Sequence, residues 1–131
     1  MNTFRELALN PELRPFMIGA ELVTTRGSSE QPSGAKLVSL ADELASCDRL
    51  DWISVTDNAG GNHMEGPSVV AKRIKEKGKD TIVHLTCKDR NRNALEACVW
   101  QYRSENLDNV LCLTGDYPAA HQGYFGTAVP V

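Results

Sequence analysis

Residues 81–118 read TIVHLTCKDRNRNALEACVWQYRSENLDNVLCLTGDYP, and this stretch decides the fold. The apolar runs at 81–87 and 109–113 have the length and composition of buried strands. Between them, Leu95, Cys98 and Tyr102 recur at steps of three and four residues, which predicts a helix over 91–105. A strand, a helix and a second strand in this order form a βαβ unit, whose two strands run parallel.

The same alternation occupies the chain before this unit. Apolar runs predict strands at 17–23 and 52–56, and helical periodicity predicts helices at 35–46 and 68–77. The predicted strands start at 17, 52, 81 and 109, so successive starts lie 35 (52 − 17), 29 (81 − 52) and 28 (109 − 81) residues apart. A (β/α)₈ barrel of about 250 residues has roughly 31 residues per unit. We therefore predict an α/β fold of the parallel TIM-barrel type, with the first four βα units only, as a single domain over 1–131. An open flavodoxin-like sheet has the same alternation, and spacing alone leaves it open.

Two flanking segments carry less information. Residues 3–16 predict a short leading helix or turn that could cover the bottom of a barrel, and residues 119–131 predict a loop. Four parallel strands cannot close a barrel, and half a barrel leaves two unpaired edges and exposed apolar surface. We therefore expect the other half to come from the remainder of a longer chain or from a partner subunit in an oligomer.

Composition excludes several classes of function. The net charge is −3, and Lys and Arg cluster only at 72–77, which gives no reason to expect nucleic-acid binding. The first residues lack the pattern of a secretory signal, and no apolar stretch approaches the roughly 20 residues of a membrane span, so we expect a cytoplasmic protein. The cysteines form no Cys-x-x-Cys pair, which favours reduced thiols over a metal or redox site. They are Cys47, Cys87, Cys98 and Cys112.

The candidate site residues are the polar side chains at the carboxyl ends of the predicted strands, where parallel barrels bind their ligands. They are Glu21 and Arg26 after the first strand, Thr56, Asp57 and Asn58 after the second, His84, Lys88 and Asp89 on or after the third, and Asp116 after the fourth.

Each candidate also has a structural interpretation. Glu21 lies in an apolar run, where an ionised carboxylate is costly unless it faces a polar cavity, so it is either a general acid or the partner of Arg26 or a lysine. Gly115 and Asp116 allow close approach of a ligand, or they form a turn. His84 donates to a ligand or is a structural histidine. The loop at 57–62 could bind a phosphate through successive amides, although it matches no phosphate-binding fingerprint.

Residues 16–118 resemble the N-terminal half of the methylenetetrahydrofolate reductase family, most specifically at 83–95 and 109–118. The resemblance implies a barrel that holds FAD at its strand ends. NADH or NADPH reduces the flavin, and 5,10-methylenetetrahydrofolate then accepts the hydride to become 5-methyltetrahydrofolate in the methionine branch of one-carbon metabolism. It also implies that Glu21 protonates the folate nitrogen, and that Asp116 lies near the flavin and the pterin and tunes the flavin potential. The remaining implied contacts with the flavin or nicotinamide are Thr56, Ala59, His84 and Gly115.

Two positions depart from the family pattern. Its bacterial members have an aromatic residue at the position of Asp57 and a flavin-contacting arginine at the position of Thr114. We keep Asp57 and Thr114 among the predicted cofactor contacts, but their chemistry implies altered contacts with FAD. The loop at 57–62 resembles a divergent branch associated with corrinoid and one-carbon metabolism. The alternative functions are therefore a non-redox module that binds a pterin or corrinoid, or takes part in methyl transfer, and an inactive half barrel that needs a partner subunit.

Overall fold

The computed structural model describes residues 2–116. Its elements are α1 (Phe4–Leu9), β1 (Gly19–Leu22), α2 (Pro32–Ala45), β2 (Trp52–Val55), η1 (Ala59–Gly61), α3 (Pro67–Glu76), β3 (Asp80–Thr86), α4 (Arg92–Ser104) and β4 (Val110–Leu113). The four strands form one sheet in the order β1-β2-β3-β4, and every neighbouring pair is parallel. The prediction of four parallel βα units is therefore confirmed.

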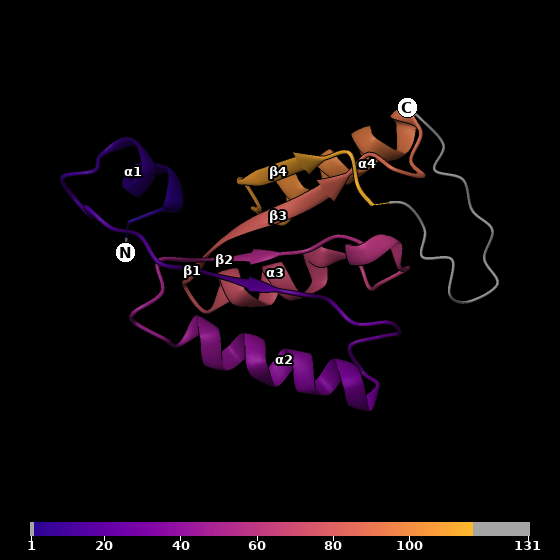
Figure 1. Ribbon diagram of the computed structural model, residues 1–131, viewed down its shortest axis with the longest axis horizontal. Helices are drawn as coiled ribbons and strands as arrows, with labels where there is room; N and C mark the ends of the chain where they lie inside the picture. The colour runs from indigo at the N-terminus through magenta and orange to yellow at the C-terminus, as the bar shows by residue number, and fades with distance from the viewer. Residues whose placement is uncertain (1, 117–131) are drawn as a thin grey trace.

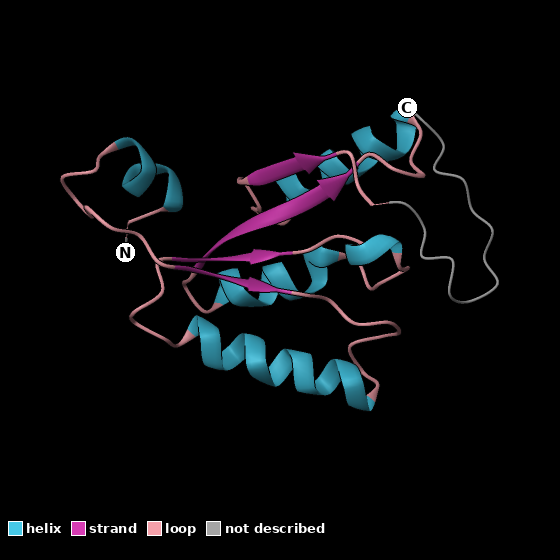
Figure 2. Cartoon of the chain, in the orientation of Figure 1, coloured by secondary structure: helices cyan, strands magenta, loops and turns pink. Residues whose placement is uncertain are grey.

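The strand order decides between the two parallel architectures. A doubly wound sheet reverses its strand order at a switch point and carries helices on both faces. Here the strands follow chain order without reversal, and α2, α3 and α4 cover one face of a curved sheet (Figures 1 and 2). Within residues 2–116 this is the arrangement of part of a (β/α) barrel, and the flavodoxin-like alternative is wrong.

The core lies between the sheet and these helices. Ile53, Val55 and Val83 point from the strands into this layer, and Ala41 and Ile74 meet them from α2 and α3; all five are fully buried. Burial of a Val or Ile side chain stabilises the folded protein by about 1.5–3 kcal/mol relative to leaving that side chain exposed. The opposite face of the sheet is more open, and Leu111 and Leu113 on β4 are exposed there.

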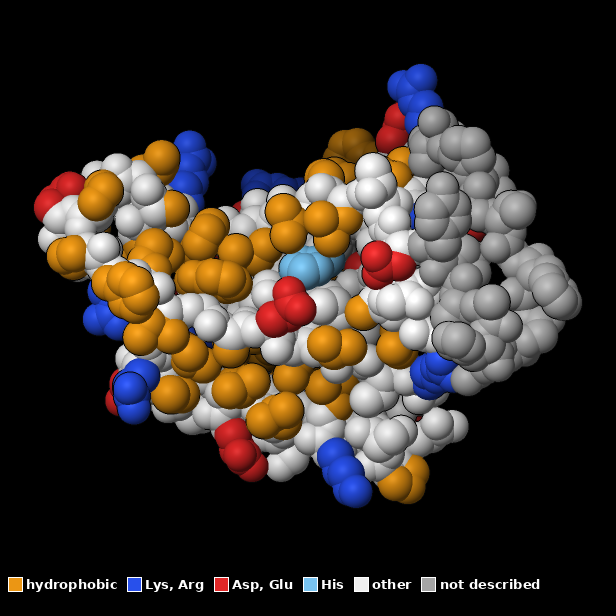
Figure 3. Space-filling model, in the orientation of Figure 1, with side chains coloured by type: hydrophobic (Ala, Val, Ile, Leu, Met, Phe, Trp, Pro, Cys, Tyr) orange, Lys and Arg blue, Asp and Glu red, His pale blue; other side chains and the backbone are white. Residues whose placement is uncertain are grey.

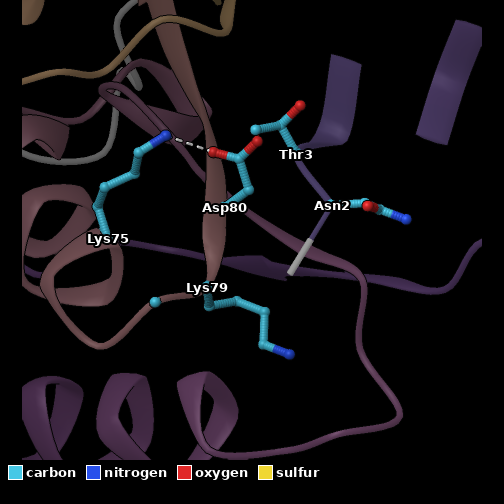
Figure 4. A pocket seen from close by; sticks show the side chains of 6 residues that line it. Asn2, Thr3, Lys75, Lys79 and Asp80 are labelled. Atoms are coloured by element: carbon cyan, nitrogen blue, oxygen red, sulfur yellow. Dashed lines mark hydrogen bonds and ion pairs between the residues drawn. The ribbon is translucent and has the colours of Figure 1, made fainter. Parts of the chain in front are cut away.

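A network of charged groups lies at the amino ends of the strands (Figure 4). Asp80 accepts hydrogen bonds from the Lys75 ammonium at 2.6 Å and from the Phe4 amide at 2.6 Å. Burial would raise the pKa of Asp80, but the bonds from Lys75 and Phe4 outweigh it and hold this pKa below its ordinary value. Lys79, only 2% exposed, donates to the carbonyls of Cys47 at 3.0 Å and Leu50 at 2.6 Å. These contacts fix α1 and the end of α2 to the sheet.

An aromatic contact also holds α1. The Phe4 ring meets the Trp52 ring edge-on, with centroids 5.6 Å apart and an angle of 72° between the planes. The Trp52 indole covers Gly19, where an added Cβ would lie 2.2 Å from a ring carbon. Glycine at the start of β1 therefore makes room for the tryptophan, and the leading helix lies at the amino ends of the strands, as expected.

Several boundaries differ from those predicted. β1 begins at Gly19 rather than at residue 17, and α2 begins at Pro32 rather than at residue 35. Proline is favoured in the first turn of a helix because its missing amide would have no partner there. The four cysteines are free thiols. The predicted loop at 119–131 lies outside the described residues.

Within residues 2–116, no helix has the length and hydropathy needed to cross a bilayer. The same part of the chain contains no group of three or more His, Cys, Asp or Glu side chains that could hold a metal ion.

Candidate functional site

A cavity of about 300 Å³ lies at the carboxyl ends of the four strands. Its lining residues come from β1, β3 and β4 and from the loops after β2 and β4: Glu21, Thr56, Asp57, Ala59, His84, Thr86, Leu113, Thr114, Gly115 and Asp116. Figure 3 shows a histidine between two acidic side chains on this side of the molecule, with apolar side chains around them. All eight residues predicted as catalytic or cofactor-binding line the cavity, while their individual roles remain predictions.

Glu21 and His84 lie close together in the cavity lining. The His84 Nε2 lies 4.0 Å from the Glu21 Oε2, with the histidine side chain 9% exposed and the glutamate side chain 59% exposed. Glu21 is therefore open to the cavity, which explains how a carboxylate can stand in an apolar run. Arg26, one of its expected partners, contacts Asn62 instead.

Thr56 provides a hydroxyl group that has no partner in the described part of the chain. The residue is only 6% exposed, and its Oγ1 accepts and donates no hydrogen bond there. Its backbone is fixed, because the amide donates to the Leu22 carbonyl at 3.0 Å. A buried hydroxyl without a hydrogen-bond partner lowers the stability of the protein. A ligand that forms a hydrogen bond with this hydroxyl would remove that cost, which would favour binding.

Asp116 joins the end of β4 to the loop after β2. Its Oδ2 accepts a hydrogen bond from the Gly60 amide at 2.9 Å, and Gly60 has a φ of 64°. The turn expected at Gly115 is present with a φ of 91°. A Cβ at Gly115 would lie 2.9 Å from the Lys88 Cβ and 3.2 Å from the Thr86 Cβ. The positive φ and the packing of these two side chains are each sufficient to require glycine at this position.

The Asp57 carboxylate is bonded to the protein through both oxygens. Arg90 binds both of them, and the Thr86 amide and hydroxyl donate to Oδ2 at 2.8 and 2.9 Å. Burial would raise the pKa of Asp57, but the hydrogen bonds from Arg90 and Thr86 hold it below its ordinary value. Asp57 therefore lines the cavity as an ionised carboxylate whose negative charge is balanced by the Arg90 guanidinium group.

Three amides of the loop at 57–62 donate within the protein. The Gly60 amide donates to Asp116, the Gly61 amide to the Asn58 carbonyl at 3.2 Å, and the Asn62 amide to the Ala59 carbonyl at 3.4 Å. These three amides are therefore already engaged, and the phosphate site stays a prediction.

Sequence reasoning gave no role to Arg90 or Thr86. Strand alternation places Thr86 on the same face as His84, but no pattern in the sequence shows that Thr86 and Arg90 meet the Asp57 carboxylate, which lies 29 and 33 residues earlier in the chain. Of the other candidates, Lys88 is buried beside Asp89, with 3.6 Å between the charged atoms, and does not line the cavity.

The sequential parallel strands define part of a (β/α)-barrel protein, a class that binds its ligands at the carboxyl ends of the strands, and polar groups collect at that end here. Residues 14–128 match the family model described as methylenetetrahydrofolate reductase, and the chain belongs to that family. The resemblance seen in the sequence is therefore confirmed. A search of curated proteins gave no match.

Proposed function

We propose that this protein takes part in the flavin-dependent reduction of 5,10-methylenetetrahydrofolate to 5-methyltetrahydrofolate, with NADH or NADPH as the reductant. Membership of the family suggests a folate-related oxidoreductase. The specific reaction is supported by the convergence of Glu21, Thr56, His84 and Asp116 on one cavity, which carries the proposal.

The cavity residues fit the ring of a flavin. The Thr56 hydroxyl lacks a partner, and the Asp116 carboxylate has one oxygen, Oδ1, without a partner among the described residues. Such groups can accept hydrogen bonds from ring N–H groups. We propose that Thr56, Ala59, His84, Thr114, Gly115 and Asp116 would hold FAD, with Asp57 acting through the bonds that fix its loop. When bound, the flavin would supply the hydride transfer.

The proposed role of Glu21 is to give a proton to the folate nitrogen. Its exposed carboxyl group can reach a ligand in the cavity, and the His84 Nε2, 4.0 Å away, would orient this carboxyl group. Asp116 would orient the flavin and pterin rings through its Oδ1, since the Gly60 amide holds its Oδ2. Its negative charge near the flavin would disfavour an anionic reduced form of the ring.

After incubation with FAD and removal of free flavin by gel filtration, the protein is expected to retain flavin absorbance at about 450 nm. Thr56→Val should weaken flavin affinity by roughly tenfold, because it removes one buried hydrogen bond. Thr81→Val is the matched control, since the Thr81 Oγ1 is also buried without a partner but lies on β3 outside the cavity lining. A protein that binds tetrahydrofolate but no flavin would contradict the redox proposal and favour a pterin-binding module.

A further inference from the structure

Arg90 lies outside the cavity lining, yet its guanidinium group is largely buried behind it. The side chain is 20% exposed and follows the end of β3. Asp89 precedes it with a φ of 59°, a conformation that non-glycine residues adopt rarely. This turn directs the Arg90 side chain back over the strand end, where its Nη1 donates to the Thr86 carbonyl at 2.7 Å.

The Asp57 carboxylate connects Arg90 to the loop after β2. Its Oδ1 accepts from the Arg90 Nη2 at 3.1 Å and from the Asn58 side-chain amide at 3.2 Å. The Asn58 Oδ1 in turn accepts from the Met64 amide at 2.9 Å, and Asn58 has a φ of 50°. Asn58 is therefore held at both ends of its side chain, which fixes the turn that begins there.

The same turn carries the Gly60 amide that binds Asp116. The Asn58 carbonyl accepts from the Gly61 amide at 3.2 Å, so the backbone between Asn58 and Gly61 has one defined conformation. The Gly60 amide then points to the Asp116 Oδ2 at 2.9 Å. Hydrogen bonds thus link Arg90 to Asp57 and Asp57 to Asn58, the backbone turn connects Asn58 to Gly60, and the Gly60 amide binds Asp116.

We propose that Arg90 is a positioning residue for Asp116: by fixing Asp57 and Asn58, it sets the place of the Gly60 amide and hence the orientation of the Asp116 carboxylate in the cavity. Arg90 touches no ligand in this arrangement. The proposal rests on the proposed function for the role of Asp116, but its physical content concerns the protein alone. It can therefore be tested without flavin or folate.

The test uses amide NMR and hydrogen exchange of the full 131-residue chain. Arg90→Gln should move the Gly60 amide resonance toward its position in Asp116→Asn, and should speed exchange of this amide by roughly tenfold, which corresponds to one hydrogen bond to a charged group. Arg90→Lys, which keeps the charge but not the two-pronged geometry, should restore part of both effects. The control is Arg103→Gln, which removes an exposed pair with Asp108 at 2.7 Å and should leave Gly60 unchanged.

The Asn58→Gly variant tests the positioning of the Gly60 amide separately from the stability of the fold. Glycine accepts the positive φ, so this variant keeps the backbone and the Asp57–Arg90 ion pair but removes the side-chain link to the turn. It should change the Gly60 resonance and exchange as Arg90→Gln does. A Gly60 amide that is unchanged in Asn58→Gly, or in a folded Arg90→Gln, would overturn the proposal. A lower unfolding midpoint with an unmoved Gly60 signal would show that Arg90 is merely structural. Failure to bind flavin would count only against the proposed function.

Discussion

Glu21→Gln is expected to slow methylenetetrahydrofolate reduction by roughly 10²–10⁴-fold, the usual contribution of a positioned general acid. Glutamine preserves the size of the side chain but has no carboxyl proton to give to the folate nitrogen. The reduction of the flavin by the nicotinamide needs no such proton and should proceed at the rate of the unmodified protein. Stopped-flow absorbance measures the two half-reactions separately.

The control for the loss of one negative charge is Glu43→Gln, on the exposed side of α2. It should leave both half-reactions unchanged. If Glu21→Gln slowed both half-reactions equally, Glu21 would act in binding or folding rather than as an acid. If it slowed neither, the proposed proton transfer would be wrong.

Asp57→Ala is expected to destabilise the protein by about 3 kcal/mol near neutral pH, because it leaves the Arg90 charge without its partner in a largely buried position. Asp108→Ala is the matched control, since it removes the acid of an exposed Arg–Asp pair and should cost only about 0–1 kcal/mol. Urea unfolding measures both free energies. Equal losses in the two variants would show that burial adds nothing to the Asp57–Arg90 pair.

The sign of the pH dependence follows from the lowered pKa of Asp57. A carboxyl group whose pKa is lower in the folded protein than in the unfolded chain stabilises the fold fully above its unfolded pKa of about 3.9. This contribution disappears as the pH falls through the lower, folded pKa. The difference in unfolding free energy between the unmodified protein and Asp57→Ala should therefore be largest near neutrality and shrink below about pH 4. Asp80, whose pKa is also lowered, is present in both proteins and cancels in the difference.

The strands could be predicted because they depend on the local pattern of apolar residues. The residues at the strand ends could be predicted because parallel strands bring their carboxyl ends to the same edge of a sheet. Apolar runs and helical steps defined the four units, and parallel strands then had to bring Glu21, His84 and Asp116 to one end of the sheet. The start of α2 at Pro32 was missed, although proline is common in the first turn of a helix.

The contacts that fix the site could not be predicted in the same way. Asp57 meets Arg90 over a separation of 33 residues, and Asp116 meets Gly60 over a separation of 56. Each contact depends on side-chain rotamers and on turns with positive φ, neither of which leaves a periodic signal in the sequence. The bonds that Asp57 accepts from Arg90 and Thr86 therefore emerged only from the structure.

Because Phe4 packs against Trp52, the fluorescence of Trp52 can report whether the leading helix α1 is docked on the sheet. The chain has two tryptophans, and Trp100 is 73% exposed on α4, whereas Trp52 is partly covered by α1 and lies over Gly19. In a Trp100→Phe variant, the emission of the remaining indole should shift to longer wavelength, and iodide should quench it more strongly, when α1 detaches. Comparison with far-ultraviolet circular dichroism would show whether the helix leaves before the sheet unfolds. Coincident transitions would mean that α1 and the sheet unfold as one cooperative unit.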